Sequence, residues 1–346
     1  MKSLATLFTS LGLAFFTQAQ AAESRIGPEM LPPFSNAPTL LENFSCYFGP
    51  FASYDSWLAG FQDRPNFDVE GFRQRFPQHV IEQRQSSIDC RVFVYESDGL
   101  LVEGVMLRPR SDAAENRRLP VVVYNRGGNP RSGLLVYGHI HSKMMPLAEL
   151  GYIVIASQYR GGRAWSNSVS AVAELDQFGG DDVHDVKNLM PIINGMPDAD
   201  SGRIAIYGAS RGGMMSYLAA RDMPQLKALI VEAGVADLEA SLTQRPEMEN
   251  VFVKLIPNYA TEKSRQLRAR SVLHWLDELP GGLPILLLHG DQDARAEVEQ
   301  SLLLAKALAA RDQPHRLVVY PGADHGLQPH RAAADAEIAA WLERHL

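Results

Sequence analysis

Short runs of β-branched and aliphatic residues recur along the chain from Ile88 onward, and most of the later runs precede a stretch with helical periodicity. Gly, Pro, Asp or Asn bound these runs, as is typical of strands. The pattern predicts eight strands, at about 88–95, 100–107, 120–125, 152–157, 203–207, 228–232, 284–289 and 316–320. It predicts helices at about 142–149, 180–195, 211–221, 295–311 and 327–345.

The first two predicted strands differ from the others. They alternate apolar and polar residues around the turn Glu96-Ser97-Asp98-Gly99, which predicts an antiparallel hairpin. The later runs are almost continuously apolar, as expected of parallel strands that helices cover on both faces. We therefore expect an α/β protein with a mostly parallel, doubly wound sheet and an antiparallel edge.

Two segments stand outside this alternation. Residues 22–85 begin with proline-rich coil and continue with aromatic-rich pieces of helical character, and we interpret them as an N-terminal extension. Residues 237–279 place polar helical sequence between two strands, which predicts a helical cap over a pocket. The main α/β domain is then expected over residues 86–346.

The start of the chain has the pattern of an export signal. Lys2 precedes an uncharged run from Leu4 to Phe16, and Ala19-Gln20-Ala21 follows as a cleavage site. The run is shorter than the roughly 20 residues that a membrane-spanning helix needs. We expect removal of residues 1–21 and a periplasmic or secreted protein without membrane insertion.

Composition and charge narrow the function further. The 346 residues are 46% apolar, and their formal net charge is −7 without a cluster of Lys or Arg, so we expect no nucleic-acid partner. Cys46 and Cys90 are the only cysteines, and the sequence leaves open whether they form a disulfide or remain buried thiols. His139 and His141 could chelate a metal on an extended segment, but we expect loop histidines, no metal site and no cofactor.

The segment Gly208-Ala209-Ser210-Arg211-Gly212 follows the predicted strand 203–207 and opens the predicted helix 211–221. This is the G-x-S-x-G pattern in the strand–turn–helix setting that a nucleophile elbow requires. Glycine is needed at both flanking positions because the strand and the helix approach closely on either side of the serine, where a side chain would not fit. We take Ser210 as the candidate nucleophile.

A serine nucleophile needs a histidine base that a carboxylate orients. Asp291 and Asp293 follow the strand 284–289, and His325 follows the strand 316–320, so all three lie at the same edge of the sheet as Ser210. We expect His325 to be the base and Asp293 its acid, with Asp291 as the alternative.

Neighbouring polar residues are expected to have other roles. Asp324 is expected to bind backbone amides, and His289 to be a core or loop histidine. An oxyanion hole is expected from the backbone N–H of Arg211 and from that of Arg126 or Gly127, although this second segment could be a plain glycine turn.

Several motifs together resemble the prolyl oligopeptidase (S9) branch of the α/β-hydrolases, over about residues 90–346. They are Arg126-Gly127-Gly128-Asn129, Tyr159-Arg160-Gly161-Gly162, Asp176-Gln177-Phe178-Gly179-Gly180-Asp181-Asp182-Val183, Gly208-x-Ser210-x-Gly212, His289-Gly290-x-x-Asp293 with Gln300-Ser301, and Asp324-His325-Gly326. The resemblance implies an α/β-hydrolase fold with Ser210, Asp293 and His325 as a catalytic triad. It favours Asp293 over Asp291, and it implies a structural role for the Phe-Gly-Gly-Asp stretch.

The sequence departs from the family at three places. Residues 22–85 stand where many members have a β-propeller, Arg126 stands where the prolyl oligopeptidases have an oxyanion-binding tyrosine, and Ala296 replaces a common valine. The resemblance implies a serine hydrolase that cleaves peptide or amide bonds in short peptides or small molecules. The alternatives are a carboxylesterase for small esters and a non-catalytic binding protein that keeps the fold.

Overall fold

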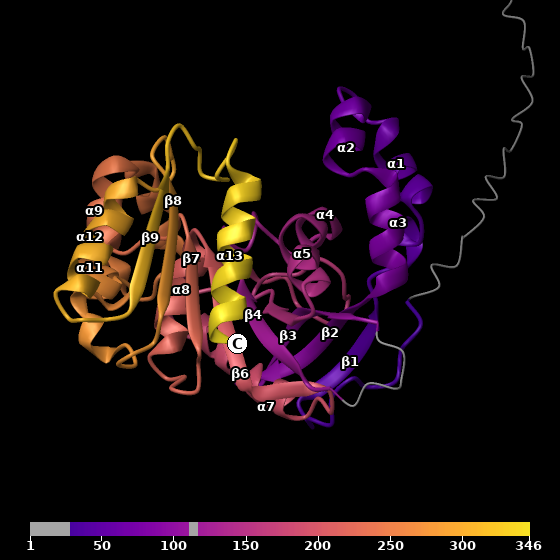
Figure 1. Cartoon of the computed structure of the whole chain (residues 1–346), viewed down its shortest axis with the longest axis horizontal. Coiled ribbons are helices and arrows are strands. Elements are labelled where there is room, and N and C mark those ends of the chain that lie inside the picture. The colour runs from indigo at the N-terminus through magenta and orange to yellow at the C-terminus, as the bar shows by residue number, and fades with distance from the viewer. Residues whose placement is uncertain (1–27, 111–116) are drawn as a thin grey trace, which may run out of the picture.

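The computed structural model describes residues 28–110 and 117–346, so the predicted export signal at residues 1–21 lies outside the described residues. A nine-stranded sheet runs through the molecule in the order β1-β2-β3-β5-β4-β6-β7-β8-β9 (Figure 1). The strands are β1 (Leu40–Ser45), β2 (Ile88–Ser97), β3 (Leu100–Pro109), β4 (Leu119–Asn125), β5 (Ile153–Ser157), β6 (Ala199–Ala209), β7 (Ala228–Glu232), β8 (Ile285–Gly290) and β9 (His315–Tyr320).

The sheet has an antiparallel and a parallel part. β1, β2, β3 and β5 pair antiparallel, whereas β5, β4, β6, β7, β8 and β9 pair parallel. The predicted hairpin and the predicted mostly parallel sheet are therefore confirmed. The count of eight strands is wrong by one, because β1 adds a ninth strand at the antiparallel edge.

The sequence analysis missed β1 because its sequence, LLENFS, contains no β-branched residue and no apolar alternation. As the edge strand it pairs along its length with β2 and has one further bridge, from Phe44 to Met30, and of its residues only Asn43 and Phe44 are buried. A disulfide between Cys46 and Cys90 joins the end of β1 to β2, which settles the question that the sequence left open.

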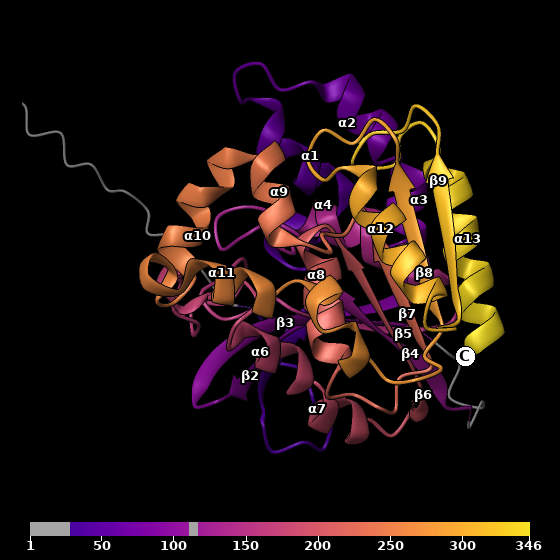
Figure 2. The ribbon, with the colours of Figure 1, turned by 90° about the vertical axis from the view of Figure 1, so that its left-hand side faces the viewer.

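Helices cover both faces of the sheet. They are α1 (Tyr54–Gln62), α2 (Val69–Arg75), α3 (Gln78–Ser87), α4 (Tyr137–His139), α5 (Met145–Glu149), α6 (Asp182–Lys187), α7 (Met190–Asn194), α8 (Arg211–Ala220), α9 (Leu238–Gln244), α10 (Glu249–Leu255), α11 (Tyr259–Ala269), α12 (Val298–Ala309) and α13 (Arg331–His345). One core lies between the sheet and α6, α7, α8 and α12, and a second lies between the sheet and α1, α3, α5 and α13 (Figures 1 and 2).

The apolar strands supply both cores because successive side chains point to opposite faces. In β4, Val121 and Val123 belong to the first core, whereas Val122 and Tyr124 belong to the second. The long apolar runs of the sequence thus reflect burial on both sides of the sheet. The single helix predicted over 180–195 is instead two short ones, and α7 begins with proline at its first turn.

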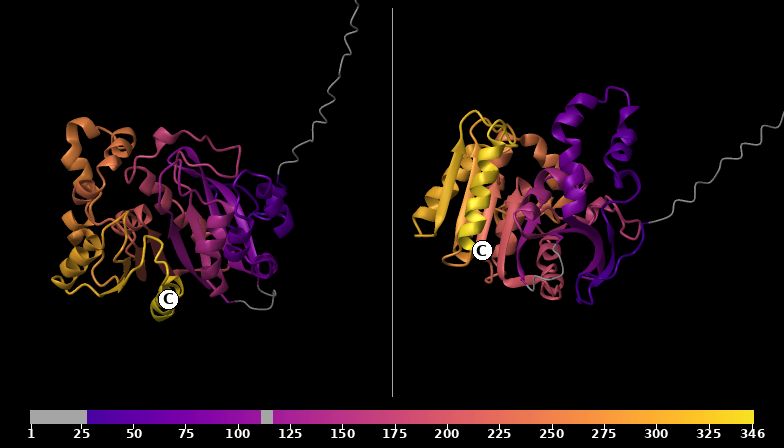
Figure 3. Two further views of the ribbon diagram at one scale, coloured as in Figure 1. Left: turned by 90° about the horizontal axis from the view of Figure 1, so that it is seen from above. Right: turned by 45° about the vertical axis from the view of Figure 1, so that its right-hand side comes forward.

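The predicted cap and the predicted extension lie at opposite ends of the molecule (Figure 3). The cap contains α9, α10 and α11 between β7 and β8, and the side chain of Asp237 caps α9 by accepting from Glu239 N and Ala240 N. In the extension, β1 joins the sheet while α1 and α2 rise on the same side as the loops after β8 and β9 (Figure 1). No helix within the two described ranges is long and apolar enough to cross a membrane.

Candidate active site

Ser210 lies at a sharp turn between β6 and α8. Its backbone angles are φ 58° and ψ −124°, a strained conformation for a residue with a Cβ atom. A Cβ atom on Gly208 would clash with the carbonyl oxygen of Gly212, and one on Gly212 would clash with that of Asn125. Both glycines are thus required by the close approach of strand and helix, as the sequence pattern predicts.

His325 lies in the loop after β9, beside Asp293 from the loop after β8. His325 Nδ1 donates to Asp293 Oδ2 at 2.7 Å, and Asp293 Oδ1 accepts from the backbone N–H groups of Arg295 and Ala296 at 2.8 and 3.0 Å. Burial by itself would raise the pKa of Asp293. Hydrogen bonds from His289 and His325 outweigh it and hold the pKa well below its usual range, so the carboxylate is ionised.

Ser210 and His325 line one cavity of about 290 Å³. In the described part of the chain, neither ring nitrogen of His325 is hydrogen-bonded to Ser210. Such contacts are often long before substrate binds and tighten in the complex. The three loops that the sequence places at the carboxyl edge of the sheet therefore meet at one site.

The competing acidic residues have structural contacts instead. Asp291 is exposed and accepts from Gly322 N at 2.6 Å, and this hydrogen bond joins the two loops. The carboxylate that contacts His325 is that of Asp293. Asp324 accepts from Gly326 N and Gln328 N, both at 2.9 Å, as expected for a carboxylate that stabilises a turn.

His289 is more than the core histidine that the sequence suggested. Its ring is fully buried, Nδ1 lies 2.7 Å from Ser301 Oγ, and Nε2 lies 2.8 Å from the carbonyl oxygen of Ala296. Because that carbonyl only accepts, Nε2 must carry a proton, and it also lies 3.3 Å from Asp293 Oδ2. His289 therefore helps to orient Asp293, through the same carboxylate oxygen that accepts from His325. The motif His289-Gly290-x-x-Asp293 was the feature of the sequence that could have predicted this contact.

The loop after β4 lies against the nucleophile. A Cβ atom on Gly127 would lie only 3.2 Å from Ser210 Cβ, so the backbone of Gly127 closely approaches Ser210. The Arg126 side chain is fully buried and donates to the carbonyl oxygens of Gln158, Gly127 and Asn129. The Arg126 side chain thus stabilises this loop through backbone carbonyl groups. It does not take the place of the oxyanion-binding tyrosine of the prolyl oligopeptidases.

Arg211, directly after the nucleophile, is buried and forms ion pairs with Asp176 and Asp182. It also donates to the carbonyl oxygen of Gly128 at 3.2 Å, which connects the elbow to the neighbouring loop. Asp182 accepts from the N–H groups of Gly179 and Gly180. The Phe-Gly-Gly-Asp stretch is therefore structural, and Asp182, which follows it, neutralises a buried arginine.

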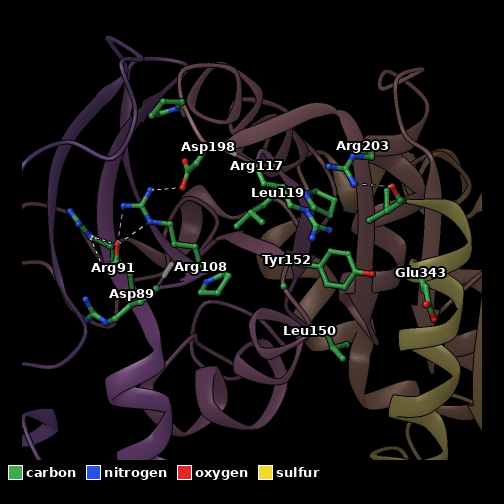
Figure 4. Close-up of a pocket in the computed structure, with 16 residues that line it drawn as sticks. Asp89, Arg91, Arg108, Arg117, Leu119, Leu150, Tyr152, Asp198, Arg203 and Glu343 are labelled. Carbon is green, nitrogen blue, oxygen red and sulfur yellow. Dashed lines mark hydrogen bonds and ion pairs between the residues drawn. The ribbon is translucent and has the colours of Figure 1, made fainter. Parts of the chain in front are cut away.

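A larger cavity, of about 1180 Å³, lies at the opposite edge of the sheet (Figure 4). It is lined by Leu119 at the start of β4 and by Tyr152 just before β5, and Arg108 joins Asp89 and Asp198 across part of it. In parallel sheets, ligands bind at the carboxyl ends of the strands. We therefore place the site in the smaller cavity, which contains Ser210 and His325.

His139 and His141 do not lie on an extended segment. They fall on the helical turns around α4, where His139 Nε2 lies 3.0 Å from Tyr124 Oη, and His141 is buried beside Trp57 and Tyr137. The described residues contain no group of three or more His, Cys, Asp or Glu side chains placed to hold a metal ion.

Comparison with known proteins places this geometry in a family. The prolyl oligopeptidase family matches residues 139–346. The uncharacterized peptidase YtmA of Bacillus subtilis is 26% identical over 74% of this chain and 92% of that protein. Dipeptidyl-peptidase 5 of Porphyromonas gingivalis is 28% identical over 72% of this chain but only 36% of that enzyme.

Solved structures show the same fold. The Pyrococcus horikoshii acylaminoacyl peptidase matches with a TM-score of 0.62 and 23% identity, over 82% of this chain and 44% of the other. The chain thus spans nearly the whole of one relative and less than half of the two larger peptidases. The family match covers more than half of the chain, and the fold and motifs agree with it. The chain therefore belongs to the prolyl oligopeptidase family and is a serine hydrolase.

Proposed function

We propose that the chain cleaves peptide or amide bonds by acyl transfer, with Ser210 as nucleophile, His325 as general base and Asp293 as the carboxylate that orients it. One observation carries this proposal: the strained Ser210 and the imidazole of His325 face a common cavity, and Asp293 holds that imidazole through Nδ1. This leaves Nε2 free to accept the serine proton.

Each step of the reaction has a group to perform it. Ser210 Oγ attacks the substrate carbonyl carbon while its proton moves to His325 Nε2, and Asp293 stabilises the imidazolium. The backbone N–H groups of Arg211 and Gly127 stabilise the oxyanion, since both residues adjoin Ser210. The leaving amine takes the proton from His325, and water then hydrolyses the acyl-enzyme by the same transfers in reverse.

The cavity supports a short substrate with an apolar side chain. Its volume of about 290 Å³ suits a small ligand, and its apolar wall combines the cap with the main domain. The wall residues are Phe178, Met214, Val235, Leu238, Met248 and Phe252. The names of the relatives, a dipeptidyl-peptidase and an acylaminoacyl peptidase, also favour a peptide bond.

Labelling with a fluorophosphonate tests the nucleophile directly. We expect the wild-type protein to be labelled, Ser210→Ala to remain unlabelled, and the exposed control Ser86→Ala to be labelled like wild type. An unlabelled wild-type protein would favour the non-catalytic binding protein with the same fold.

A substrate panel then separates the two hydrolase functions. We expect blocked aminoacyl p-nitroanilides to be hydrolysed at a rate that requires Ser210. Turnover of p-nitrophenyl esters without any turnover of the anilides would instead indicate a carboxylesterase.

We also propose that the protein acts in an oxidising compartment, the periplasm or the exterior. The Cys46–Cys90 disulfide supports this location, because such bonds persist mainly outside the reducing cytosol. Cell fractionation with thiol labelling of the native protein tests it. Recovery of a reduced protein from the cytosol would contradict the proposal.

A further inference from the structure

The peptide bond between Arg126 and Gly127 lies directly beside the nucleophile. A Cβ atom on Gly127 would lie 2.9 Å from the carbonyl oxygen of Ala209, the residue before Ser210. The backbone N–H groups of Gly127 and Arg211 have no hydrogen-bond acceptor among the residues that the structure describes. Two such N–H groups beside a serine nucleophile are the donors that an oxyanion requires.

Four successive carbonyl groups of this loop accept hydrogen bonds from buried side chains. The donors are Tyr159 for the carbonyl of Arg126, the Arg126 side chain for those of Gly127 and Asn129, and Arg211 for that of Gly128. Tyr159 Oη lies 3.1 Å from the oxygen that it contacts. The C=O and N–H groups of a trans peptide point in opposite directions, so a carbonyl held toward the interior turns the N–H of the same peptide away from it. Tyr159 therefore fixes the direction of the Gly127 N–H.

Tyr159 is itself held in place from several sides. Its side chain is fully buried, and the guanidinium groups of Arg126 and Arg211 lie 4.8 and 5.3 Å from the centre of its ring. Its backbone has φ 59°, which is uncommon for a residue with a Cβ atom, and its N–H donates to Ser157 Oγ at 3.0 Å. Strained residues of this kind persist where the surrounding contacts fix them, and they gather at active sites. Burial raises the pKa of Tyr159, so its hydroxyl stays protonated and donates to the carbonyl.

We propose that Tyr159 is a positioning residue of the oxyanion hole: its hydroxyl holds the peptide bond before Gly127 so that the Gly127 N–H faces the oxyanion formed when Ser210 attacks. This inference rests on the proposed function, and it adds a residue that is not part of the cavity lining. The hydrogen bond to the carbonyl oxygen also polarises the peptide, which strengthens its N–H as a donor. Negative charge develops on the substrate oxygen only in the transition state, so loss of the hydroxyl lowers kcat and leaves substrate binding nearly unchanged.

Two compounds with the same acyl group separate oxyanion stabilisation from substrate binding. N-acetyl-Phe-p-nitroanilide reports kcat and KM. With N-acetyl-Phe trifluoromethyl ketone, Ser210 Oγ bonds to the carbonyl carbon, the serine proton moves to His325, and a stable hemiketal oxyanion remains, so its Ki reports the oxyanion hole. In Tyr159→Phe we expect kcat/KM for the anilide to fall about tenfold and Ki for the ketone to rise by a similar factor, while KM stays within about twofold of wild type.

Two further variants locate the effect. Tyr47→Phe is the matched control, because its hydroxyl also donates to a backbone carbonyl, that of Ile88 at 3.1 Å, but lies in the N-terminal extension. It should keep the wild-type kcat, KM and Ki. Ser157→Ala removes the acceptor of the Tyr159 N–H and should raise the ratio of Ki to KM, by less than Tyr159→Phe does. Thermal transitions show which variants are folded, and Ser157→Ala decides the question by the same ratio if Tyr159→Phe does not fold.

A folded Tyr159→Phe protein with the wild-type kcat/KM and Ki would overturn the inference. A rise of KM as large as the rise of Ki would also overturn it, because that pattern indicates altered packing around the cavity rather than a weakened oxyanion contact. The proposed function survives either result as long as a fluorophosphonate labels Ser210 in the wild-type protein. An unlabelled wild-type protein would remove the proposed function itself, and this inference with it.

Discussion

At the antiparallel end of the sheet, β1, β2 and β3 are joined by antiparallel ladders and by the Cys46–Cys90 disulfide, with the residues that face the cores buried. At the parallel end, β6, β8 and β9 lead into loops that hold Ser210, Asp293 and His325, where strained backbone and partly exposed polar groups gather. The comparison teaches that the candidate catalytic residues lie only in the loops of the parallel end, whereas groups that stabilise the fold lie at both ends. Changes in those loops should therefore affect activity, and changes elsewhere at either end should affect stability.

The largest effect is expected at the parallel end. Asp293→Asn should lower kcat/KM by roughly 10⁴-fold, because the amide no longer holds His325 in the correct tautomer or stabilises the imidazolium. Asp291→Asn is the matched control and should stay close to wild type, since the Asp291 side chain binds the backbone N–H of Gly322 in a turn. Steady-state kinetics of the two variants measures this difference. A large loss of kcat/KM in Asp291→Asn with little change in Asp293→Asn would assign the acid role to Asp291.

Removal of the disulfide tests the antiparallel end. The pair Cys46→Ala and Cys90→Ala should lower the free energy of unfolding by about 4 kcal/mol, because the unfolded chain gains the entropy that the crosslink removes. Urea unfolding measures this change. Under folding conditions kcat should remain within about twofold of wild type, and a large loss of kcat in the folded variant would break the division between the two ends.

A smaller, pH-dependent effect on stability is expected from Glu232. This residue ends β7 at the parallel end of the sheet, next to the Ser210 elbow. Burial would raise the pKa of Glu232, but Lys143 and Arg331 outweigh it and lower the pKa from 4.5 to about 2. Because the folded-state pKa is depressed, its stabilisation is complete above about pH 4.5 and is lost as the pH falls toward 2. The stabilisation at stake is on the order of 3 kcal/mol.

Urea unfolding between pH 2 and 5 measures this dependence. In Glu232→Gln the free energy of unfolding should fall less steeply with decreasing pH than in wild type. The exposed Glu299→Gln should keep the wild-type slope. Equal slopes for wild type and Glu232→Gln would show that Glu232 does not stabilise the parallel end through its charge.

Much of the parallel end could be predicted because its signals are local. Long apolar runs identify strands buried on both faces, and Gly208-x-Ser210-x-Gly212 after such a run identifies an elbow, since only glycine fits beside it. The edge strand β1 escaped prediction because its stability comes from pairing with β2 and from the disulfide rather than from its own sequence.

The sequence by itself determined the order of the strands from β2 to β9, the position of Ser210 at an elbow, and the placement of the acid and histidine loops at the same edge of the sheet. Periodicity, glycine sterics and the chain order of a parallel sheet are sufficient for these conclusions. Only the tertiary structure decided that Asp293 rather than Asp291 contacts His325, that His289 supports it, and that the Arg126 side chain turns inward. The contacts of His325 with Asp293 and of Arg126 with Gln158 each join residues 32 positions apart in the chain, so the packing of the folded chain sets them rather than a local pattern.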